Sequence, residues 1–341
     1  MKKVGFIALL LFAAFVVTGF LLPKHVRVER SVTVDQPATM MFAILNSFQH
    51  FNEWSPWAAN DEGAEFTVSG PDAGVGATLS WVGDPRLAGT GSLEIVTSEP
   101  FEYIQMQLDR DFQGLATSGF RLQAMGDSTR ITWAFDSDLT EGLGMFDGFI
   151  ARYVGLLFER WVGTDYQKGL ASLKQFAESM PASDFRQIEI SRVDVEPQLI
   201  LFVSTQSSQD SADVAAALSA AYYEISEFMN ANGVHMNGQP MAITRAWEEG
   251  GYQFDAAIPV DFVPDLLPDN IQAGRSPSGP GIKAIHVGRL DQVMPTYEKL
   301  AAYMSAHGLS EGRVSWEHYV TDPASTEAAE TITHIYIMLD E

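Results

Sequence analysis

The sequence predicts an α+β protein of two domains behind one apolar N-terminal helix, and three observations support this fold class. Residues 4–22 run for nineteen positions without a charge. Between residues 64 and 139, short runs of alternating polarity follow one another, and a single long helical pattern comes next. Beyond residue 198, the order strand, helix, strand, strand occurs twice. Short strands at regular spacing favour an antiparallel meander over a βαβ sheet.

The composition describes a folded chain without thiol chemistry. Its 341 residues are enough for two ordinary domains, and 46% of them are apolar. The absence of cysteine excludes disulfides, thiolate nucleophiles and cysteine-ligated zinc. The seven histidines show no metal-binding spacing, and no P-loop, GxSxG elbow or dinucleotide-binding glycine motif occurs. We therefore expect neither a metal nor a cofactor.

The charge is distributed unevenly. The first thirty residues hold five basic side chains and one acid, whereas the whole chain has a net charge of −23. The rest of the chain is therefore strongly acidic. Such a surface repels phosphate backbones, so we expect no nucleic-acid partner.

The N-terminal segment, residues 4–22, has the pattern of a transmembrane anchor. At about 1.5 Å per residue it matches a bilayer core of about 30 Å. Lys2, Lys3 and Lys24 flank it. The alternative is a cleaved signal peptide, but its apolar region is usually about 7–15 residues, and Thr18 to Phe20 make a poor cleavage site.

A retained anchor implies a single-pass membrane protein with the lipid bilayer as a partner. Basic residues lie on both sides of the segment, so the positive-inside rule leaves the orientation open. We place the body of the chain outside the cytoplasm.

The first domain is predicted over residues 26–180. A strand over 26–37 and a short helix over 38–48 precede six strands, at 64–70, 76–83, 91–100, 102–110, 118–126 and 128–139. Phe146 to Met180 then form one long amphipathic helix, which ends before Pro181. A curved sheet closed by one such helix leaves a hollow between the two.

The second domain is predicted over residues 186–341 and contains a repeat. Its first half has strands at 198–206, 238–247 and 252–260 around a helix at 214–233; its second half has strands at 281–290, 313–320 and 331–339 around a helix at 293–308. The helices end at Asn-Gly and His-Gly pairs, which are typical helix stops. Two equal βαββ halves tend to pack about a pseudo-twofold axis, so we expect a pocket at their seam.

The stretch SWEHYVTDP, residues 315–323, contains the candidate functional acid, Glu317. Side chains alternate along a strand, so Glu317 shares a face with Tyr319, while Trp316 and His318 share the other. That face is either solvent-exposed or lines a pocket. A carboxylate among aromatic rings has a raised pKa unless a cation compensates it. In its charged form this carboxylate would bind a cationic ligand. In its protonated form it could act as a general acid.

The first domain resembles the START-like, helix-grip superfamily, also called SRPBCC or polyketide cyclase-like. The resemblance rests on the element order and on FNEWSPW (51–57), SGPDAGVGATLSW (69–81) and TDYQKGLASLKQF (164–176). It implies a cavity for apolar ligands under the long helix. Trp54 and Trp57 either line that cavity or fix the corner between helix and strand.

The second domain resembles the GyrI-like, AraC-type effector-binding domain. The resemblance rests on the duplicated pattern and on WEHYVTDP (316–323). It implies that Glu317 lies at the base of an aromatic pocket for cationic or polarised ligands, with Tyr319 and Trp316 beside it. Trp247 is then expected to form the other wall, and Tyr223 to contribute from the first helix. Family members often carry a helix-turn-helix, which this sequence lacks.

Two functions follow from these observations. The first is a membrane-anchored protein that binds or senses an amphipathic, hydrophobic or cationic small molecule without catalysis. The alternative is a hydrolase or cyclase-like enzyme that acts on a reactive hydrophobic molecule, with Glu317 as acid or base. The first is favoured because the sequence offers no clear second catalytic partner for Glu317.

Overall fold

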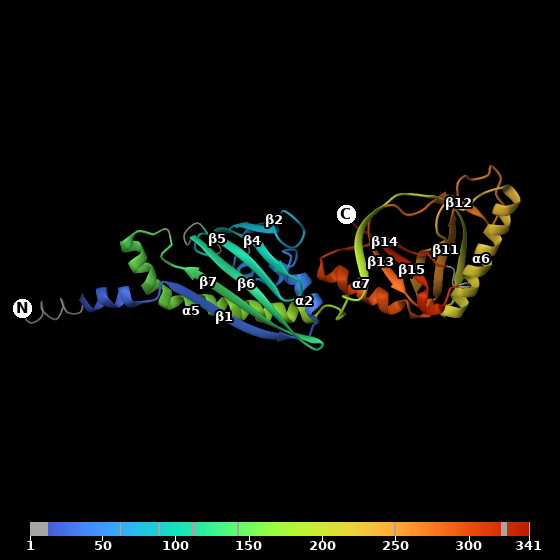
Figure 1. Ribbon diagram of the computed structural model, residues 1–341. Helices are drawn as coiled ribbons and strands as arrows, with labels where there is room; N and C mark the ends of the chain where they lie inside the picture. Colours follow the sequence, from blue (N-terminus) through green and yellow to red (C-terminus); the bar gives the residue numbers. More distant parts are fainter. Residues whose placement is uncertain are drawn as a thin grey trace, which may run out of the picture. The chain divides into compact units, whose positions relative to one another are not determined.

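The computed structural model describes residues 13–61, 63–87, 89–110, 114–141, 143–248, 250–321 and 326–340. The chain divides into two compact units (Figure 1). The N-terminal unit contains the described residues up to Asp184, and the C-terminal unit contains most of those from Phe185 onward. Both units are α+β, and each is built on one antiparallel sheet.

The N-terminal unit is a seven-stranded antiparallel meander with one long helix. Its sheet order is β1-β7-β6-β5-β4-β3-β2. The strands are β1 (His25–Val34), β2 (Glu65–Ser69), β3 (Thr78–Val82), β4 (Thr90–Glu99), β5 (Tyr103–Arg110), β6 (Gly114–Met125) and β7 (Ser128–Asp138). Burial alternates along β7, as expected when one face of a sheet covers the core.

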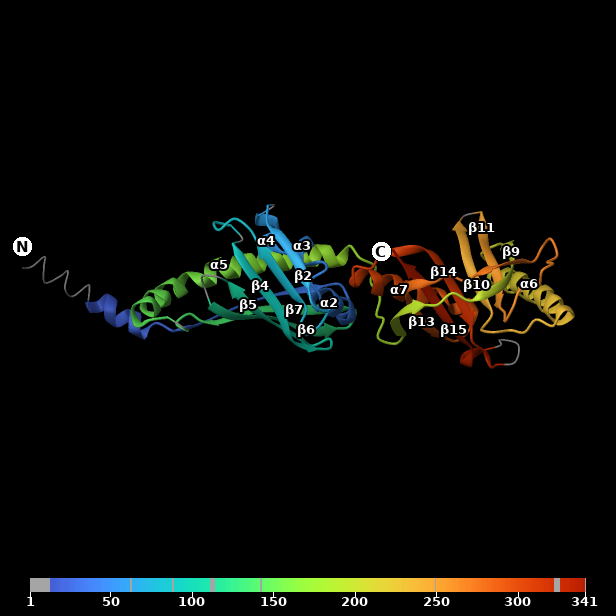
Figure 2. The same ribbon diagram turned by 90° about the horizontal axis from the view of Figure 1, so that it is seen from above.

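The helices of this unit after β1 are α2 (Ala38–Leu45), α3 (Phe51–Trp54), α4 (Pro56–Asn60) and α5 (Met145–Glu178). Ser55 caps α4 by accepting hydrogen bonds from two backbone amides, and Pro56 occupies the first helical position. The helix α5 runs along the sheet of this unit in both views (Figures 1 and 2).

The large buried side chains of α5 begin at Phe158. Phe158, Tyr166, Leu170 and Leu173 are buried, whereas Phe146 is 74% exposed. The predicted amphipathic pattern therefore corresponds to a buried face at Leu170 and Leu173, while apolar side chains near the start of the helix, such as Phe146, stay exposed.

The predicted transmembrane helix over residues 4–22 is corrected by the structure. Among the residues described, no helix combines the length and apolar composition needed to cross a bilayer, so the single-pass membrane location is not supported. Residues 4–12 of the predicted span lie outside the described residues. The described part is helical over residues 13–21. There the Phe15 ring stacks on Tyr153 of α5 with the ring centres 4.5 Å apart, although Phe15 itself is 44% exposed.

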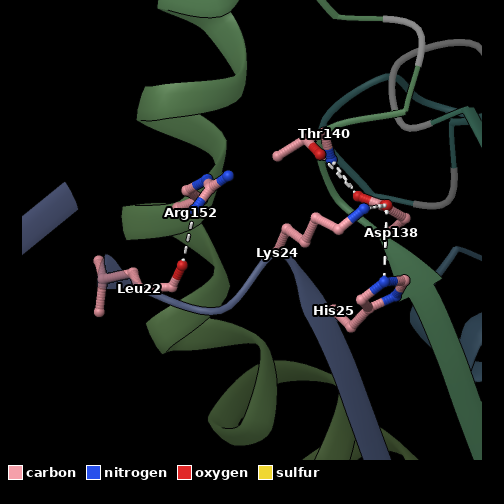
Figure 3. A network of polar contacts seen from close by, with 6 residues as sticks. All are labelled: Leu22, Lys24, His25, Asp138, Thr140 and Arg152. Atoms are coloured by element: carbon pink, nitrogen blue, oxygen red, sulfur yellow. Dashed lines mark hydrogen bonds and ion pairs between the residues drawn. The ribbon is translucent and has the colours of Figure 1, made fainter. Parts of the chain in front are cut away.

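Polar contacts fix the connection between this N-terminal helix and β1 (Figure 3). Arg152 of α5 donates to the Leu22 carbonyl at 2.9 Å, and Lys24 pairs with Asp138 at 2.9 Å. Asp138 also accepts hydrogen bonds from the backbone and side chain of Thr140. The Lys24 and Thr140 contacts hold the pKa of the Asp138 carboxyl well below its usual range.

The C-terminal unit contains the strand, helix, strand, strand order twice. The first half is β9 (Leu199–Ser207), α6 (Ser211–Asn232), β10 (Met241–Glu248) and β11 (Gly251–Pro259); the second is β13 (Gly279–Val287), α7 (Met294–Ala306), β14 (Glu311–Tyr319) and β15 (Ile332–Leu339). Asp210 caps the start of α6, and Gly233 ends it with φ 68°. Gly308, just after α7, has φ 64°.

The two halves share one eight-stranded sheet with a symmetric order. That order is β12-β9-β11-β10-β14-β15-β13-β8, in which β8 spans Glu189–Val195 and β12 spans Gln272–Arg275. The halves meet where β10 pairs with β14, and the pairing covers only Met241 with His318, Ala242 with Glu317 and Ile243 with Trp316. This junction places Glu317 in the middle of the seam.

The close approach between α5 and the N-terminal sheet generates the first prediction. A Cβ on Gly169 would lie 2.8 Å from Trp133 and 2.9 Å from Pro56, whereas one on Gly148 of the same helix would meet nothing nearer than 3.5 Å. Gly169→Ala is expected to lower the free energy of unfolding by about 1–3 kcal/mol through overpacking. Gly148→Ala, the matched control, is expected to raise it by up to about 1 kcal/mol through helix propensity. Urea unfolding of both variants checks this; equal effects would contradict it.

Candidate ligand-binding site

The strand β14 and its neighbours place Glu317 on the face of the sheet that both helices cover. Glu317 lies opposite Ala242 on β10 and Ile335 on β15. Ala242 packs in a cluster with Leu218 of α6, and Ile335 packs in another with Leu300 of α7. The carboxylate therefore lies between two separately packed apolar clusters.

Tyrosine hydroxyls surround this carboxylate. Tyr297 of α7 donates to Glu317 Oε1 at 3.0 Å, and Tyr319 of β14 donates to Oε2 at 2.9 Å. Tyr222 of α6 packs edge-on against the Tyr319 ring, with the ring centres 6.4 Å apart. The hydroxyl oxygen of Tyr222 is buried and has no hydrogen-bond partner within the described structure. One strand and two helices thus bring four side chains to one place.

Within the part of the chain that the structure describes, no lysine, arginine or histidine forms an ion pair with Glu317, which accepts hydrogen bonds from the two tyrosines. Burial raises the pKa of Glu317, while the hydrogen bonds from Tyr319 and Tyr297 and the nearby His286 oppose that rise. Burial, followed by the nearby Glu317 charge, also raises the pKa of Tyr222, Tyr297 and Tyr319 well above 10. The hydroxyls therefore remain donors at neutral pH.

This group of side chains is partly accessible to solvent. Glu317, Tyr297, Tyr319 and Tyr222 are all intermediate in exposure, whereas Trp316, next in the chain, is only 1% exposed. A group that is desolvated by its neighbours and still accessible can exchange water for a ligand. The arrangement can provide one negative charge, aromatic surface and one unused hydroxyl.

The structure brings together only some of the residues that the sequence singled out. Glu317 and Tyr319 meet on one face. Trp316 lies on the other, stacked on Tyr336 with the rings 4.8 Å apart. Trp247 is 49% exposed near the far end of β10, against Tyr252, and Tyr223 is 69% exposed.

Two contributors were missing from the predicted site. Tyr297 lies on α7 and Tyr222 directly precedes Tyr223 on α6. Successive residues of a helix point about 100° apart, so the exposure of Tyr223 follows from the inward direction of Tyr222. The Asp-Pro pair of the motif, residues 322–323, lies outside the described residues.

A second possible site is a cavity of about 160 Å³ in the N-terminal unit, between its sheet and α5. Its walls are mainly aromatic. Trp57 lines it, while Trp54 is buried beside Trp133 with the ring centres 5.6 Å apart. The other lining residues are Phe51, Phe66, Trp81, Leu93, Leu108, Ser118, Trp133, Phe135, Phe158, Trp161, Val162, Asp165 and Tyr166.

A metal ion would need several histidine or carboxylate side chains at one place. Over the described residues, no three histidine, aspartate or glutamate side chains gather into a group that could hold an ion. His286, inside β13, contacts Thr296 Oγ1 at 2.8 Å and the Arg289 carbonyl at 3.1 Å, so both of its ring nitrogens have partners.

Two family models match consecutive parts of the chain. Residues 25–178 match the model described as polyketide cyclase/dehydrase and lipid transport. Residues 188–340 match the GyrI-like small molecule binding domain. An SRPBCC-like domain precedes a GyrI-like one. This is the order predicted from the sequence, and both are small-molecule-binding domains.

Comparison with solved structures gives distant similarities, each over less than half of this chain. A START superfamily protein from Mycobacterium smegmatis is 15% identical, with 45% of this chain and 98% of that chain covered and a TM-score of 0.34. The EcmrR C-terminal domain is 14% identical, with coverages of 46% and 99% and a TM-score of 0.41. A hydrolase from Listeria innocua is 15% identical, with coverages of 45% and 92% and a TM-score of 0.35. No match was found among curated proteins.

His318, on the opposite face of β14 from Glu317, generates a prediction about pH. Burial, and then His334 and Lys283, lower the pKa of His318 to about 4. An unfolded histidine takes up its proton near pH 6.5, so this site favours the folded state above that pH and loses its contribution as the pH falls toward 4. The loss is expected to be at most about 3 kcal/mol.

Urea unfolding between pH 7 and pH 4 checks this, with His318→Gln expected to flatten the pH dependence. His235→Gln, at a site whose side chain is 80% exposed, controls for removing a histidine. An unchanged slope in His318→Gln would contradict the assignment.

Proposed function

We propose that the chain is a non-catalytic small-molecule-binding protein whose C-terminal unit takes an amphipathic cation, with Glu317 as its counter-charge. The observation that carries this proposal is that the carboxylate accepts hydrogen bonds from two tyrosine hydroxyls and has no ion-pair partner among the described residues. Two hydroxyls compensate only part of the cost of desolvating a negative charge. A cationic ligand would supply the missing charge.

The aromatic neighbours support the same class of ligand. A cation above a tyrosine ring gains about 0.5–2 kcal/mol from the ring quadrupole. Tyr319 and Tyr222 offer two rings at 6.4 Å in an edge-on arrangement, and both pack on the apolar cluster beside α6. A ligand with a charged head and an apolar body would satisfy both parts of the site.

An acid–base role for Glu317 is the second candidate, and the raised pKa of its carboxyl favours it. A protonated carboxyl could donate to a leaving group, as in enzymes whose general acid lies among apolar groups. Catalysis also needs a second group to activate water. Tyr222, Tyr297 and Tyr319 are poor bases because their hydroxyls stay protonated at neutral pH.

A matched pair of probes tests the counter-charge. Phenyltrimethylammonium and tert-butylbenzene have nearly the same shape and differ in charge. The wild-type chain is expected to bind the cation more tightly, and Glu317→Gln to weaken cation binding about ten- to a hundredfold, because one charge pair at an effective dielectric near 20 is lost. Binding of the neutral probe should be unchanged. Calorimetric titration measures both.

The control is Glu311→Gln, which removes the same charge from an exposed position on the same strand. Equal weakening in both variants would mean that Glu317 acts through net charge only, and the proposal would fail. Mass spectrometry of recovered reactive esters and epoxides decides the second candidate: products formed by the wild type and not by Glu317→Gln would make the protein an enzyme.

The unpartnered hydroxyl of Tyr222 gives a further prediction. Burying a hydroxyl without a partner costs about 1–3 kcal/mol, so Tyr222→Phe is expected to stabilise the ligand-free chain by about 1 kcal/mol. Tyr252→Phe is the matched control, because the Tyr252 hydroxyl lies 3.3 Å from Thr244 Oγ1 and its removal should not stabilise. Urea unfolding monitored in the C-terminal unit decides; destabilisation by Tyr222→Phe would refute this account of the hydroxyl.

A further inference from the structure

An open hollow of about 560 Å³ lies in the C-terminal unit, lined by residues of β9, β10, β11 and β12. Phe202 of β9 lines it and packs in the same cluster as Trp316. Val203, the next residue, packs instead beside Ile225 of α6. Since successive residues of a strand point to opposite faces, the hollow belongs to the Trp316 face of the sheet. It is therefore separate from the site at Glu317, which lies on the helix-covered face.

A buried acid fixes Arg245 at this hollow. Arg245 Nε donates to Asp255 Oδ2 at 2.7 Å, and Nη2 donates to the same oxygen. The Asp255 side chain is 3% exposed, and its Oδ1 accepts a hydrogen bond from Ser204 at 2.8 Å. The β10–β11 register shifts between Thr244 and Ala246, which makes Arg245 the extra residue of a β-bulge. The strand irregularity and the buried acid together set the direction of the guanidinium.

The guanidinium of Arg245 keeps one of its two hydrogen-bonding edges unused. A guanidinium carries five N–H donors in one plane. Asp255 occupies the edge formed by Nε and Nη2. The edge formed by Nη1 and Nη2 has no partner within the described structure, and the side chain is 55% exposed. Because arginine keeps its charge at any ordinary pH, this edge offers a ligand two parallel charged donors.

The lining of the hollow favours a carboxylate at that edge. Asp255 is the only acid among the lining residues, and both of its oxygens already accept hydrogen bonds. Gln206, Gln253 and Gln272 line the hollow as neutral, exposed amides. The two oxygens of a carboxylate match two parallel N–H groups of a guanidinium. A net charge of −23 repels multiply charged anions most strongly, so a single negative charge is favoured.

We infer that this hollow is a binding site for a small organic monocarboxylate, whose two oxygens accept from the free edge of Arg245 and whose apolar body rests on Phe202. Asp255 acts as the positioning residue, since it holds the guanidinium and does not itself meet the ligand. The inference goes beyond the proposed cation site, because it uses the other face of the sheet and other residues. Failure of either proposal leaves the other standing.

Benzoate and benzamide provide the test, because they have nearly the same shape and only benzoate is charged. The dissociation constants of both are measured on the full chain by ligand-observed NMR. The wild type is expected to bind benzoate about tenfold more tightly than benzamide, as one charge-assisted pair would give. Gln253→Glu adds a negative charge to the hollow and leaves Arg245 and Asp255 in place. It is expected to weaken benzoate binding about fivefold or more and to spare benzamide.

Gln123→Glu is the matched control, because it adds the same charge at an exposed position on β6 of the other unit. Equal affinity of the wild type for both probes, or no binding of benzoate, would overturn the inference. An unchanged preference for benzoate in Gln253→Glu, or an equal loss in Gln123→Glu, would overturn it as well. Both variants alter exposed side chains, so neither outcome depends on a change in the core.

A double variant tests the guanidinium itself. Arg245→Gln/Asp255→Asn removes both charges together, so that no unpaired charge is left buried. It is expected to bind benzoate and benzamide with similar affinity. A tenfold preference for benzoate that persists in the folded double variant would place the carboxylate elsewhere and overturn the inference.

Discussion

The short antiparallel pairing between β10 and β14 is the constraint on which the C-terminal site depends. It joins two βαββ halves through three residue pairs, and the central pair sets Glu317 against Ala242. A slip of one residue would turn the acid to the face of Trp316 and put that large ring between the helices. The small side chain of Ala242 leaves the space above the seam to the tyrosines. The position of the site therefore depends on the β10–β14 register as well as on the acid itself.

The same unit contains a buried acid whose charge is compensated by protein side chains. Asp255 on β11 is 2% exposed and accepts hydrogen bonds from the Arg245 guanidinium through two nitrogens and from Ser204 at 2.8 Å. A charged guanidinium that donates from two nitrogens compensates a buried carboxylate far better than neutral donors do. The hydrogen bonds that Glu317 accepts among the described residues come from phenols. Asp255 and Glu317 lie 62 positions apart in the sequence and belong to the same sheet. This difference in their partners is the physical reason to assign a structural role to Asp255 and to propose a ligand-binding role for Glu317.

How far the sequence could predict this site depends on the type of element. Strand alternation alone assigned Glu317 and Tyr319 to one face and Trp316 to the other, because the period of two leaves no freedom. The sequence pattern of the helices was less informative about side-chain direction. The pattern around Tyr222 and Tyr223 did not define which of the two points inward, and no pattern marked Tyr297 as a site residue. The apolar run before Pro23 was assigned to a membrane from its composition alone, and no helix among the described residues is long and apolar enough to cross one. In the described part of the run, Phe15 and Phe20 contact the rings of Phe149 and Tyr153 on α5.

The Glu317 site and the N-terminal cavity leave different hydrogen-bonding groups unused. At Glu317 the unused group is an acceptor, and in the N-terminal unit it is a donor. Glu317 has acceptor capacity left over and stays partly accessible, so a cation can reach it without losing all its water. In the N-terminal unit, Trp133 donates to Ser118, and Ser118 and Tyr166 share a second hydrogen bond, so one donor hydrogen of this group stays unused on the wall of a largely aromatic cavity. An oxygen acceptor matches such a donor, whereas a cation matches the acceptor at Glu317. The two sites therefore leave different polar groups for a ligand to meet.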